Sequence, residues 1–279
     1  MKQLVLPERP GLGRLGRHVS HDPKSRAFAF DTSKLTVTSC RHARRVSVFD
    51  QGNLGSCTTN AGLGVLATDP FYDLLRDTVV WGEDTAVELY SEVTAADDFP
   101  GQYPPDDTGS DGLTVGKVFK TRGYIKEYRH TFSLEDALKA LSVTPVITGI
   151  NWYSSFDRPS PTGYVSIDSG AYVRGGHEIE LEEIDAEQKL IGFTNSWGTS
   201  WGANGRGYMS WTTFARLLNE DGDVTVFIPN DTTPVQPDVD ATDVTLFNSL
   251  RDWSHAPHVG SNHRAALAFR QWAKQKGFE

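Results

Sequence analysis

The sequence is short of cysteine, of positive charge and of long apolar runs, and each shortage excludes a class of protein. Its 279 residues include two cysteines, Cys40 and Cys57, too few for a disulfide framework, which favours a reducing, cytoplasmic location. No apolar stretch approaches the roughly 18 residues of a membrane-spanning helix. The first residues lack the apolar core and the cleavage motif of a signal peptide, so we expect none.

Acidic residues outnumber basic ones, with 36 Asp and Glu against 27 Lys and Arg and a net charge of −9. Because such a chain repels polyanions, we expect no nucleic-acid partner and no membrane partner. Glu178, Glu180, Glu182 and Glu183 alternate along a predicted strand, and we interpret them as a solvated face. The weaker alternative is that they bias a cleft toward basic substrates. The basic cluster at residues 41–45 is interpreted as a solvated turn.

Cys57 ends the run QGNLGSC, residues 51–57. The small residues before it predict a tight loop, and residues 58–68 (TTNAGLGVLAT) predict a helix that starts at the cysteine. The N–H groups and dipole at a helix start favour a thiolate. The same geometry aims the Cys57 N–H at a developing oxyanion, and Gln51 can aim its side-chain amide at the same point. Taken alone, Cys57 has an alternative role as an inert, buried side chain.

Two further segments carry groups that a cysteine nucleophile needs. His177 follows Gly176 and opens the alternating run HEIELEEID, which predicts a strand. Asn195 begins the turn NSWGTSWGANGRG, where its amide can accept from one imidazole nitrogen and fix the tautomer. Trp197 can cover that hydrogen bond. Taken singly, His177 has an alternative role as a structural histidine, and the segment after Asn195 has one as a plain β-turn. Neither alternative explains why all three segments occur in this order.

With these motifs the chain resembles the papain-like cysteine peptidases, in particular bacterial or phage-encoded members without a long propeptide. His177 and Asn195 lie 120 and 138 residues after Cys57, against a family spacing of about 130–150. The resemblance implies that Cys57 is the nucleophile and His177 the general base and acid. It implies that Asn195 orients His177, and that Gln51 and the Cys57 N–H form an oxyanion hole. No metal or cofactor is implied.

The sequence departs from the family at two positions. Leu54 stands where the family usually has cysteine, and Thr58 stands where it usually has Trp or Tyr. A usual disulfide and an aromatic ring beneath the nucleophile are therefore missing. A phage-encoded member would work in the host cytoplasm or in a virion. The substrate contacts that the resemblance implies are Gly109, Ser110, Asp111, Gly112, Gly176 and Trp197; for 109–112 a plain surface loop is the alternative.

Periodicity predicts an α+β fold of two lobes, which the resemblance also implies. The helical lobe spans about residues 45–135, with helices at 58–68, 85–96 and 114–122 and a Pro/Gly/Asp loop at 97–112. A β lobe, barrel-like and antiparallel, spans about 136–230. It holds a helix at 133–141 and strands at 145–151, 164–167, 177–184, 189–194, 207–211 and 224–228. Cys57 and His177 then face each other across a cleft that can hold a peptide.

The two ends of the chain carry separate predictions. Residues 1–44 form an extended arm with a short strand near 33–38. The arm is either a short pro-segment that covers the cleft or a strap outside the core, and the alternation in residues 31–39 favours the strap. Residues 231–242 predict a polar linker. Residues 243–279 predict a helical pair too small to be stable alone, which docks on the core or on a protein partner.

The predicted function is hydrolysis of peptide bonds through a thioester intermediate on Cys57, with a peptide or protein as substrate. One alternative keeps the site and changes the substrate to cell-wall peptides or another amide. A second alternative is a virion or structural protein that retains the peptidase fold and is anchored through residues 243–279.

Overall fold

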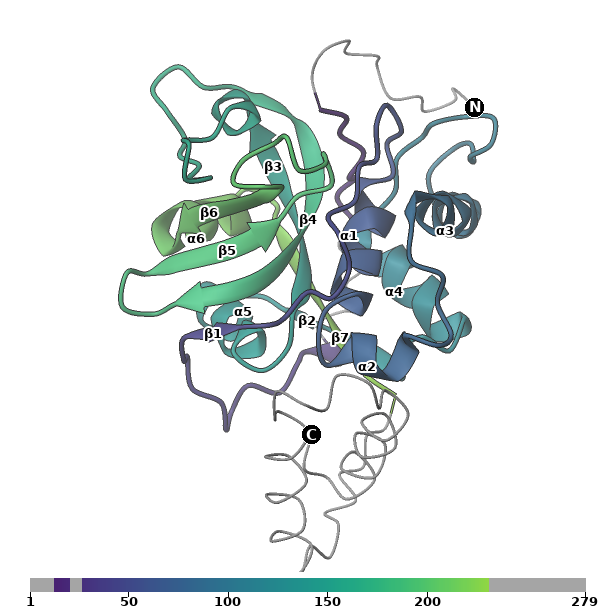
Figure 1. Ribbon diagram of the computed structural model, residues 1–279, viewed down its shortest axis with the longest axis horizontal. Coiled ribbons are helices and arrows are strands. Elements are labelled where there is room, and N and C mark those ends of the chain that lie inside the picture. The colour runs from purple at the N-terminus through teal and green to yellow at the C-terminus, as the bar shows by residue number, and fades with distance from the viewer. Residues whose placement is uncertain (1–12, 21–26, 231–279) are drawn as a thin grey trace, which may run out of the picture. The chain divides into compact units, whose positions relative to one another are not determined.

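The structure is a computed structural model that describes residues 13–20 and 27–230 (Figure 1). The predicted linker at 231–242 and helical pair at 243–279 lie outside the described residues. The described residues form two lobes, and β4 of one lobe packs against α1 of the other. The first half of the described chain is mainly helical, and the second half is rich in strands.

The helical lobe surrounds one buried helix. Its helices are α1 (Cys57–Leu66), α2 (Phe71–Leu75), α3 (Glu83–Ala96) and α4 (Gly112–Thr121). Every residue of α1 is buried, because α3, α4 and β4 all pack on it. A β-carbon at Gly62 would lie 2.7 Å from Val115, so glycine permits this close packing. In the described ranges, no helix is both long and apolar enough to cross a membrane.

The second lobe is built on an antiparallel sheet in the order β2-β7-β3-β4-β5-β6, with β1 paired to β4. The strands are β1 (Cys40–Arg41), β2 (Glu127–Thr131), β3 (Val146–Tyr153), β4 (Val173–Asp185), β5 (Leu190–Thr194), β6 (Arg206–Ser210) and β7 (Asp223–Ile228). Helices α5 (Leu134–Leu141) and α6 (Trp211–Asn219), with the short 3₁₀ helix Ser154–Asp157, complete this lobe. Ser133 caps α5 as its side chain accepts from the Asp136 N–H.

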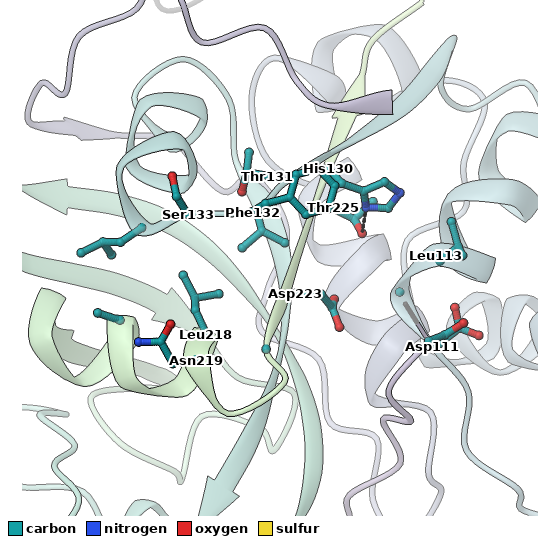
Figure 2. Close-up of a pocket in the computed structure, with 16 residues that line it drawn as sticks. Asp111, Leu113, His130, Thr131, Phe132, Ser133, Leu218, Asn219, Asp223 and Thr225 are labelled. Atoms are coloured by element: carbon teal, nitrogen blue, oxygen red, sulfur yellow. Dashed lines mark hydrogen bonds between the residues drawn. The ribbon is translucent and has the colours of Figure 1, made fainter. Parts of the chain in front are cut away.

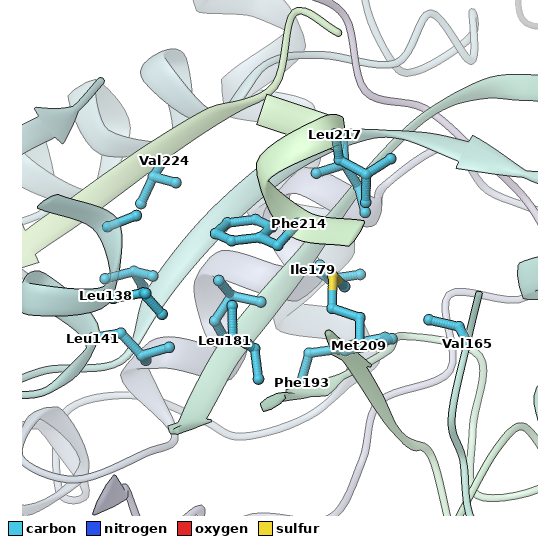
Figure 3. Packing of buried hydrophobic residues seen from close by; sticks show 14 of the residues in the cluster. Leu138, Leu141, Val165, Ile179, Leu181, Phe193, Met209, Phe214, Leu217 and Val224 are labelled. Carbon is cyan, nitrogen blue, oxygen red and sulfur yellow. The ribbon is translucent and has the colours of Figure 1, made fainter. Parts of the chain in front are cut away.

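The apolar core of this lobe lies between the sheet and helices α5 and α6 (Figure 3). Ile179 and Leu181 of β4 face this core, together with Phe193 of β5 and Met209 of β6. The intervening residues of β4 must point to the opposite face, because side chains alternate along a strand. That opposite face is the one that α1 covers.

Three of the four glutamates predicted to form a solvated face of β4 are buried, so the expectation was wrong for them, whereas Glu183 is partly exposed. Glu178, Glu180 and Glu182 are at most 1% exposed, because their face of β4 lies in the interface between the two lobes. Glu180 forms an ion pair with Arg44, and Glu182 lies 2.6 Å from an Arg206 nitrogen. The basic cluster at 41–45 is therefore not only a solvated turn, because its Arg44 is the buried ion-pair partner of Glu180. Burial, with the Glu180 charge, raises the pKa of Glu182 to about 7.

Some predicted elements are wrong and some were missed. Residues 33–38 form no strand; there the Thr38 N–H donates to the Ser142 hydroxyl at 3.0 Å. Residues 164–167 form only an isolated bridge, between Tyr164 and Tyr208. The missed elements are α2, β2 and α6. Strand β2 (EYRHT) has a largely polar sequence, so no apolar alternation indicated it. It pairs with β7 and also forms an isolated bridge from His130 to Ala29.

Candidate active site

Cys57 is the first residue of α1 and is completely buried. Backbone N–H groups of Glu178, Gly16 and Thr58 lie near its sulfur. Burial raises the pKa of the Cys57 thiol to about 12, and these N–H groups oppose the rise. The thiol is therefore neutral in this arrangement. Glu178 follows His177 directly, so its contact with the sulfur brings the cysteine and the histidine together from different lobes.

His177 is oriented by Asn195, with Nε2 of the imidazole 2.8 Å from Oδ1 of the amide. Because an amide oxygen only accepts, Nε2 donates and Nδ1 carries the lone pair. Nδ1 is buried and has no hydrogen-bond partner among the described residues. Burial lowers the pKa of His177 to about 4, against the effect of the Asn195 hydrogen bond. A neutral imidazole with an open Nδ1 has the form that a general base requires.

Two tryptophans enclose the His177 imidazole. The ring of Trp197 lies 5.0 Å from it and that of Trp152 lies 4.7 Å from it, between ring centres. Aromatic cover keeps water from the bond between His177 and Asn195, which strengthens that bond. Trp197 occupies the place predicted for it. Trp152 was missed, because only the register of β3 on β4, which pairs it with Gly175, brings it to the histidine.

Gln51 lies where the loop before Cys57 meets the turn that carries Asn195. Its Oε1 accepts from the Ser196 hydroxyl at 2.5 Å, and its Nε2 donates to the Leu54 carbonyl at 2.7 Å. Its backbone N–H donates to the Ser196 carbonyl at 2.9 Å. These bonds hold the amide firmly, and a primary amide carries a second N–H that can serve an oxyanion.

Part of the N-terminal arm lies directly over this site, between the two lobes (Figure 1). The Ser110 N–H donates to the Gly16 carbonyl at 2.8 Å, and the His18 N–H donates to the Ser110 carbonyl at 2.7 Å. From the other lobe, the Gly176 carbonyl accepts from the Arg17 N–H at 3.1 Å. With the Gly16 N–H near the Cys57 sulfur, the arm is bonded to both walls and covers the thiol.

The six residues predicted to contact substrate divide into two groups. Ser110 and Gly176 bind the backbone of the arm, Gly109 lies against its Gly16 carbonyl, and the Trp197 indole N–H donates to its Arg14 carbonyl at 3.1 Å. Asp111 instead caps α4, because its carboxylate accepts from the Thr114 N–H at 2.8 Å. Gly112 packs against Glu178, since a β-carbon at Gly112 would lie 2.7 Å from a Glu178 carboxylate oxygen.

A cavity of about 650 Å³ extends from this region (Figure 2). Asp111 at the start of α4 and Asp223 at the start of β7 both line it, together with His130, Phe132 and Leu218. Asp223 is paired there with Arg17 of the arm. Within the described part of the chain, no group of His, Cys, Asp and Glu side chains is arranged to hold a metal ion.

Solved structures that share this fold are cysteine proteases. Xylellain, a cysteine protease from Xylella fastidiosa, matches with a TM-score of 0.62 and 18% identity over 81% of this chain and 100% of its own. Procathepsin B S9 from Trypanosoma congolense matches with a TM-score of 0.55 and 11% identity over 78% and 87% of the two chains. Digestive procathepsin L 3 of Tenebrio molitor matches with a TM-score of 0.54 and 12% identity over 77% of this chain and 75% of its own. No protein-family profile and no curated protein sequence matches the chain.

These likenesses confirm the predicted fold. The chain has the papain-like two-lobe α+β fold, with a helical lobe and an antiparallel β lobe. At 18% identity and below, what the chain shares with these proteins is the fold. The chemistry of the site has to be argued from the residues of this chain.

Proposed function

We propose that this chain is a cysteine-type peptidase in which Cys57 is the nucleophile and His177 the general base. One observation carries the proposal: Nε2 of His177 donates to Asn195 and leaves Nδ1 without a partner among the described residues, and the backbone of the next residue, Glu178, lies near Cys57 at the start of α1. A nucleophile, a base and an orienting amide are the parts that acyl transfer needs. The shared papain-like fold supports the same assignment.

In this mechanism the reaction begins when the cleft is open to substrate and the Cys57 proton moves to Nδ1 of His177. The thiolate attacks a peptide carbonyl, and the oxyanion is held by the Cys57 N–H and the Gln51 amide. His177 then protonates the leaving amine, which gives a thioester on Cys57. Water hydrolyses the thioester with His177 as base, and the free thiol returns.

The arm holds this proposed enzyme inactive. It fills the strip between Ser110 and Gly176 where a peptide would lie, and it covers the thiol. The arm presents the Gly16 N–H to the sulfur, whereas attack requires a carbonyl carbon at that place. The arm is therefore a blocking segment rather than a bound substrate. This assigns the role of pro-segment to residues 13–18, while residues 40–41 pair with β4 on the outside of the lobe.

Alkylation by iodoacetamide tests the proposal, because only a thiolate reacts fast. With the arm in place we expect Cys57 to react slowly from about pH 5 to pH 8, since its pKa is raised to about 12. In Gly16→Val, which displaces the arm, Cys57 should react fast even at about pH 5 as a thiolate beside an imidazolium. Cys40, mapped in the same digest, is the internal control, as burial raises its pKa too. The proposal is contradicted if Cys57 in Gly16→Val loses its reactivity below about pH 8.5, as an ordinary thiol does.

Replacing Asn195 should weaken the enzyme without abolishing it. In the Gly16→Val chain, whose cleft is open, Asn195→Ala leaves Nε2 of His177 without the acceptor at 2.8 Å, so the imidazole is no longer held in one orientation. We expect kcat to fall about a hundredfold, because a misplaced catalytic group costs about that factor. Asn53→Ala is the matched control, since Asn53 is exposed in the loop before Cys57. An unchanged kcat in Asn195→Ala would remove the orienting role.

Casein and purified peptidoglycan, assayed in parallel on the Gly16→Val protein, separate the candidate substrates. Cleavage of casein is the expected result. Cleavage of peptidoglycan alone would assign the same site to cell-wall amides. A protein that cleaves neither, has no reactive thiol and co-purifies in a stable assembly would instead be a structural protein with this fold.

A further inference from the structure

The side chain of Arg17 leaves the arm and enters a buried pocket in the wall of the cleft. Only 1% of this side chain is exposed. Its Nη2 forms an ion pair with the Asp223 carboxylate and donates to the Asp221 carbonyl at 2.7 Å. One guanidinium nitrogen thus meets two acceptors from the segment that enters β7.

Glu178 forms the inner wall of this pocket. It is fully buried, and neither of its carboxylate oxygens has a hydrogen-bond partner among the described residues. Burial and the charge of Asp223 raise the pKa of Glu178, while the charge of Arg17 lowers it. A buried carboxyl group without a direct partner is costly unless a cation lies near, and the cation here is Arg17.

Glycine provides the space for the guanidinium group. A β-carbon at Gly149 on β3 would collide with Nε of Arg17 and would lie 2.9 Å from an oxygen of Glu178. The pocket floor therefore has no side chain at the point where the guanidinium lies. The Asp111 carboxyl also contributes to the charge, as it interacts electrostatically with both Glu178 and Asp223.

We propose that this pocket, defined by Glu178, Asp223, the Asp221 carbonyl and Gly149, selects an arginine side chain in the substrate. The inference rests on the proposed peptidase function. A substrate backbone bound between Ser110 and Gly176, where the arm backbone is bonded, directs one side chain into this pocket. Arginine fits better than lysine, because a guanidinium spreads its charge over three nitrogens, so that one can pair with Asp223 while the others lie near Glu178. Arg17 occupies the pocket as an internal competitor.

The test uses the full-length chain with Gly16→Val and Arg17→Ala, so that the arm neither covers Cys57 nor fills the pocket. A peptide library is scanned with Arg, Lys or Leu at each position in turn, and kcat/KM is measured for each. At one position we expect Arg to exceed Leu by at least about tenfold, with Lys between them. Adding Asp223→Asn or Glu178→Gln should bring that ratio close to one. Asp223 is 21% exposed, so its isosteric variant is the safer of the two for folding.

Glu183→Gln is the matched control. Glu183 lies on the same strand as Glu178 but pairs with Arg206 at 2.7 Å, away from the pocket, so the preference for arginine should persist. Equal cleavage of Arg and Leu peptides, with activity present, overturns the pocket and leaves the peptidase standing.

A binding measurement keeps the two proposals separable. N-acetyl-arginine amide is titrated calorimetrically into the same protein with Gly16→Val and Arg17→Ala, with N-acetyl-leucine amide as the comparison. Binding of the arginine compound alone, lost in Asp223→Asn, supports the pocket even if no peptide is cleaved, and in that case the peptidase proposal fails. Absence of both binding and Arg-selective cleavage overturns the pocket.

Discussion

Gly16→Val should convert a blocked protein into an active peptidase, with kcat/KM raised at least about tenfold. A β-carbon at residue 16 would overlap the Gly55 carbonyl and would lie 2.8 Å from the Gly55 α-carbon. Both groups are backbone, and Gly55 belongs to the loop that positions Cys57, so the arm has to move instead. If the free energy that holds the arm in the cleft falls by roughly 1.4 kcal/mol, the population of molecules with an open cleft rises tenfold.

The contacts that valine disrupts make this magnitude reasonable. The Ser110 N–H bond to the Gly16 carbonyl and the place of the Gly16 N–H near the Cys57 sulfur both depend on the path of the backbone at this residue. The hydrogen bond to Ser110 contributes about 0.5–1.5 kcal/mol. Displacing residue 16 also withdraws Arg17 from Asp223 and Arg14 from Asp107, its ion-pair partner at 2.5 Å.

Val19→Ala is the control for this prediction, because Val19 is on the same arm but 46% exposed. Its kcat/KM should match that of the unmodified chain. The measurement is hydrolysis of a fluorogenic peptide at equal protein concentration, with the number of reactive Cys57 thiols counted in each sample. If the unmodified chain is already as active as Gly16→Val, residues 13–18 do not block the cleft.

The candidate site was predictable from sequence where neighbours along the chain are also neighbours in space. Cys57 opens a helix directly after a loop of small residues, and that local order is visible in the sequence. His177 lies on β4 and Asn195 directly follows β5, the adjacent antiparallel strand, where the register pairs Glu180 with Thr194. Such a pairing follows from two strands joined by a short turn, so periodicity and motif together indicated it.

The arginine pocket could not be predicted in the same way, because its parts come from segments far apart in sequence. Arg17, Gly149, Glu178 and Asp223 meet only when the arm, β3, β4 and β7 are in place. Alternation along β4 separates the histidine face from the glutamate face. It does not say that α1 covers the glutamates, and so the sequence indicated a solvated face where the structure has a buried one.

The arm illustrates a related limit. Its sequence has no strong period, because its backbone is bonded to loops and a strand edge rather than to its own residues. Alternation in residues 31–39 indicated a strand, yet that segment follows the outside of the lobe without joining the sheet until Cys40. What positions residues 13–18 is a set of close approaches at Gly16 and Gly176, which is a property of the folded cleft.

Cys57→Ala, made in the Gly16→Val chain, should reduce peptide hydrolysis by at least about a thousandfold, since the proposed thioester forms on the Cys57 sulfur. The fold should survive, because alanine keeps the helix start and removes a single sulfur atom from a buried position. Circular dichroism and the thermal midpoint check that survival. The opened cleft matters, because in the blocked chain a low rate would not distinguish the loss of the nucleophile from the presence of the arm.

Cys40→Ala in the same background is the matched control for the loss of a thiol. Cys40 donates to the Leu141 carbonyl at 3.3 Å on the far side of the β lobe from the arm, so its removal should leave kcat/KM unchanged. Because Cys40 and Cys57 are the two cysteines of the chain, the pair of variants assigns any thiol-dependent step to one sulfur atom. Hydrolysis that persists in Cys57→Ala at the rate of its parent would show that the reaction proceeds without this thiol, and the assignment of His177 as its base would fall with it.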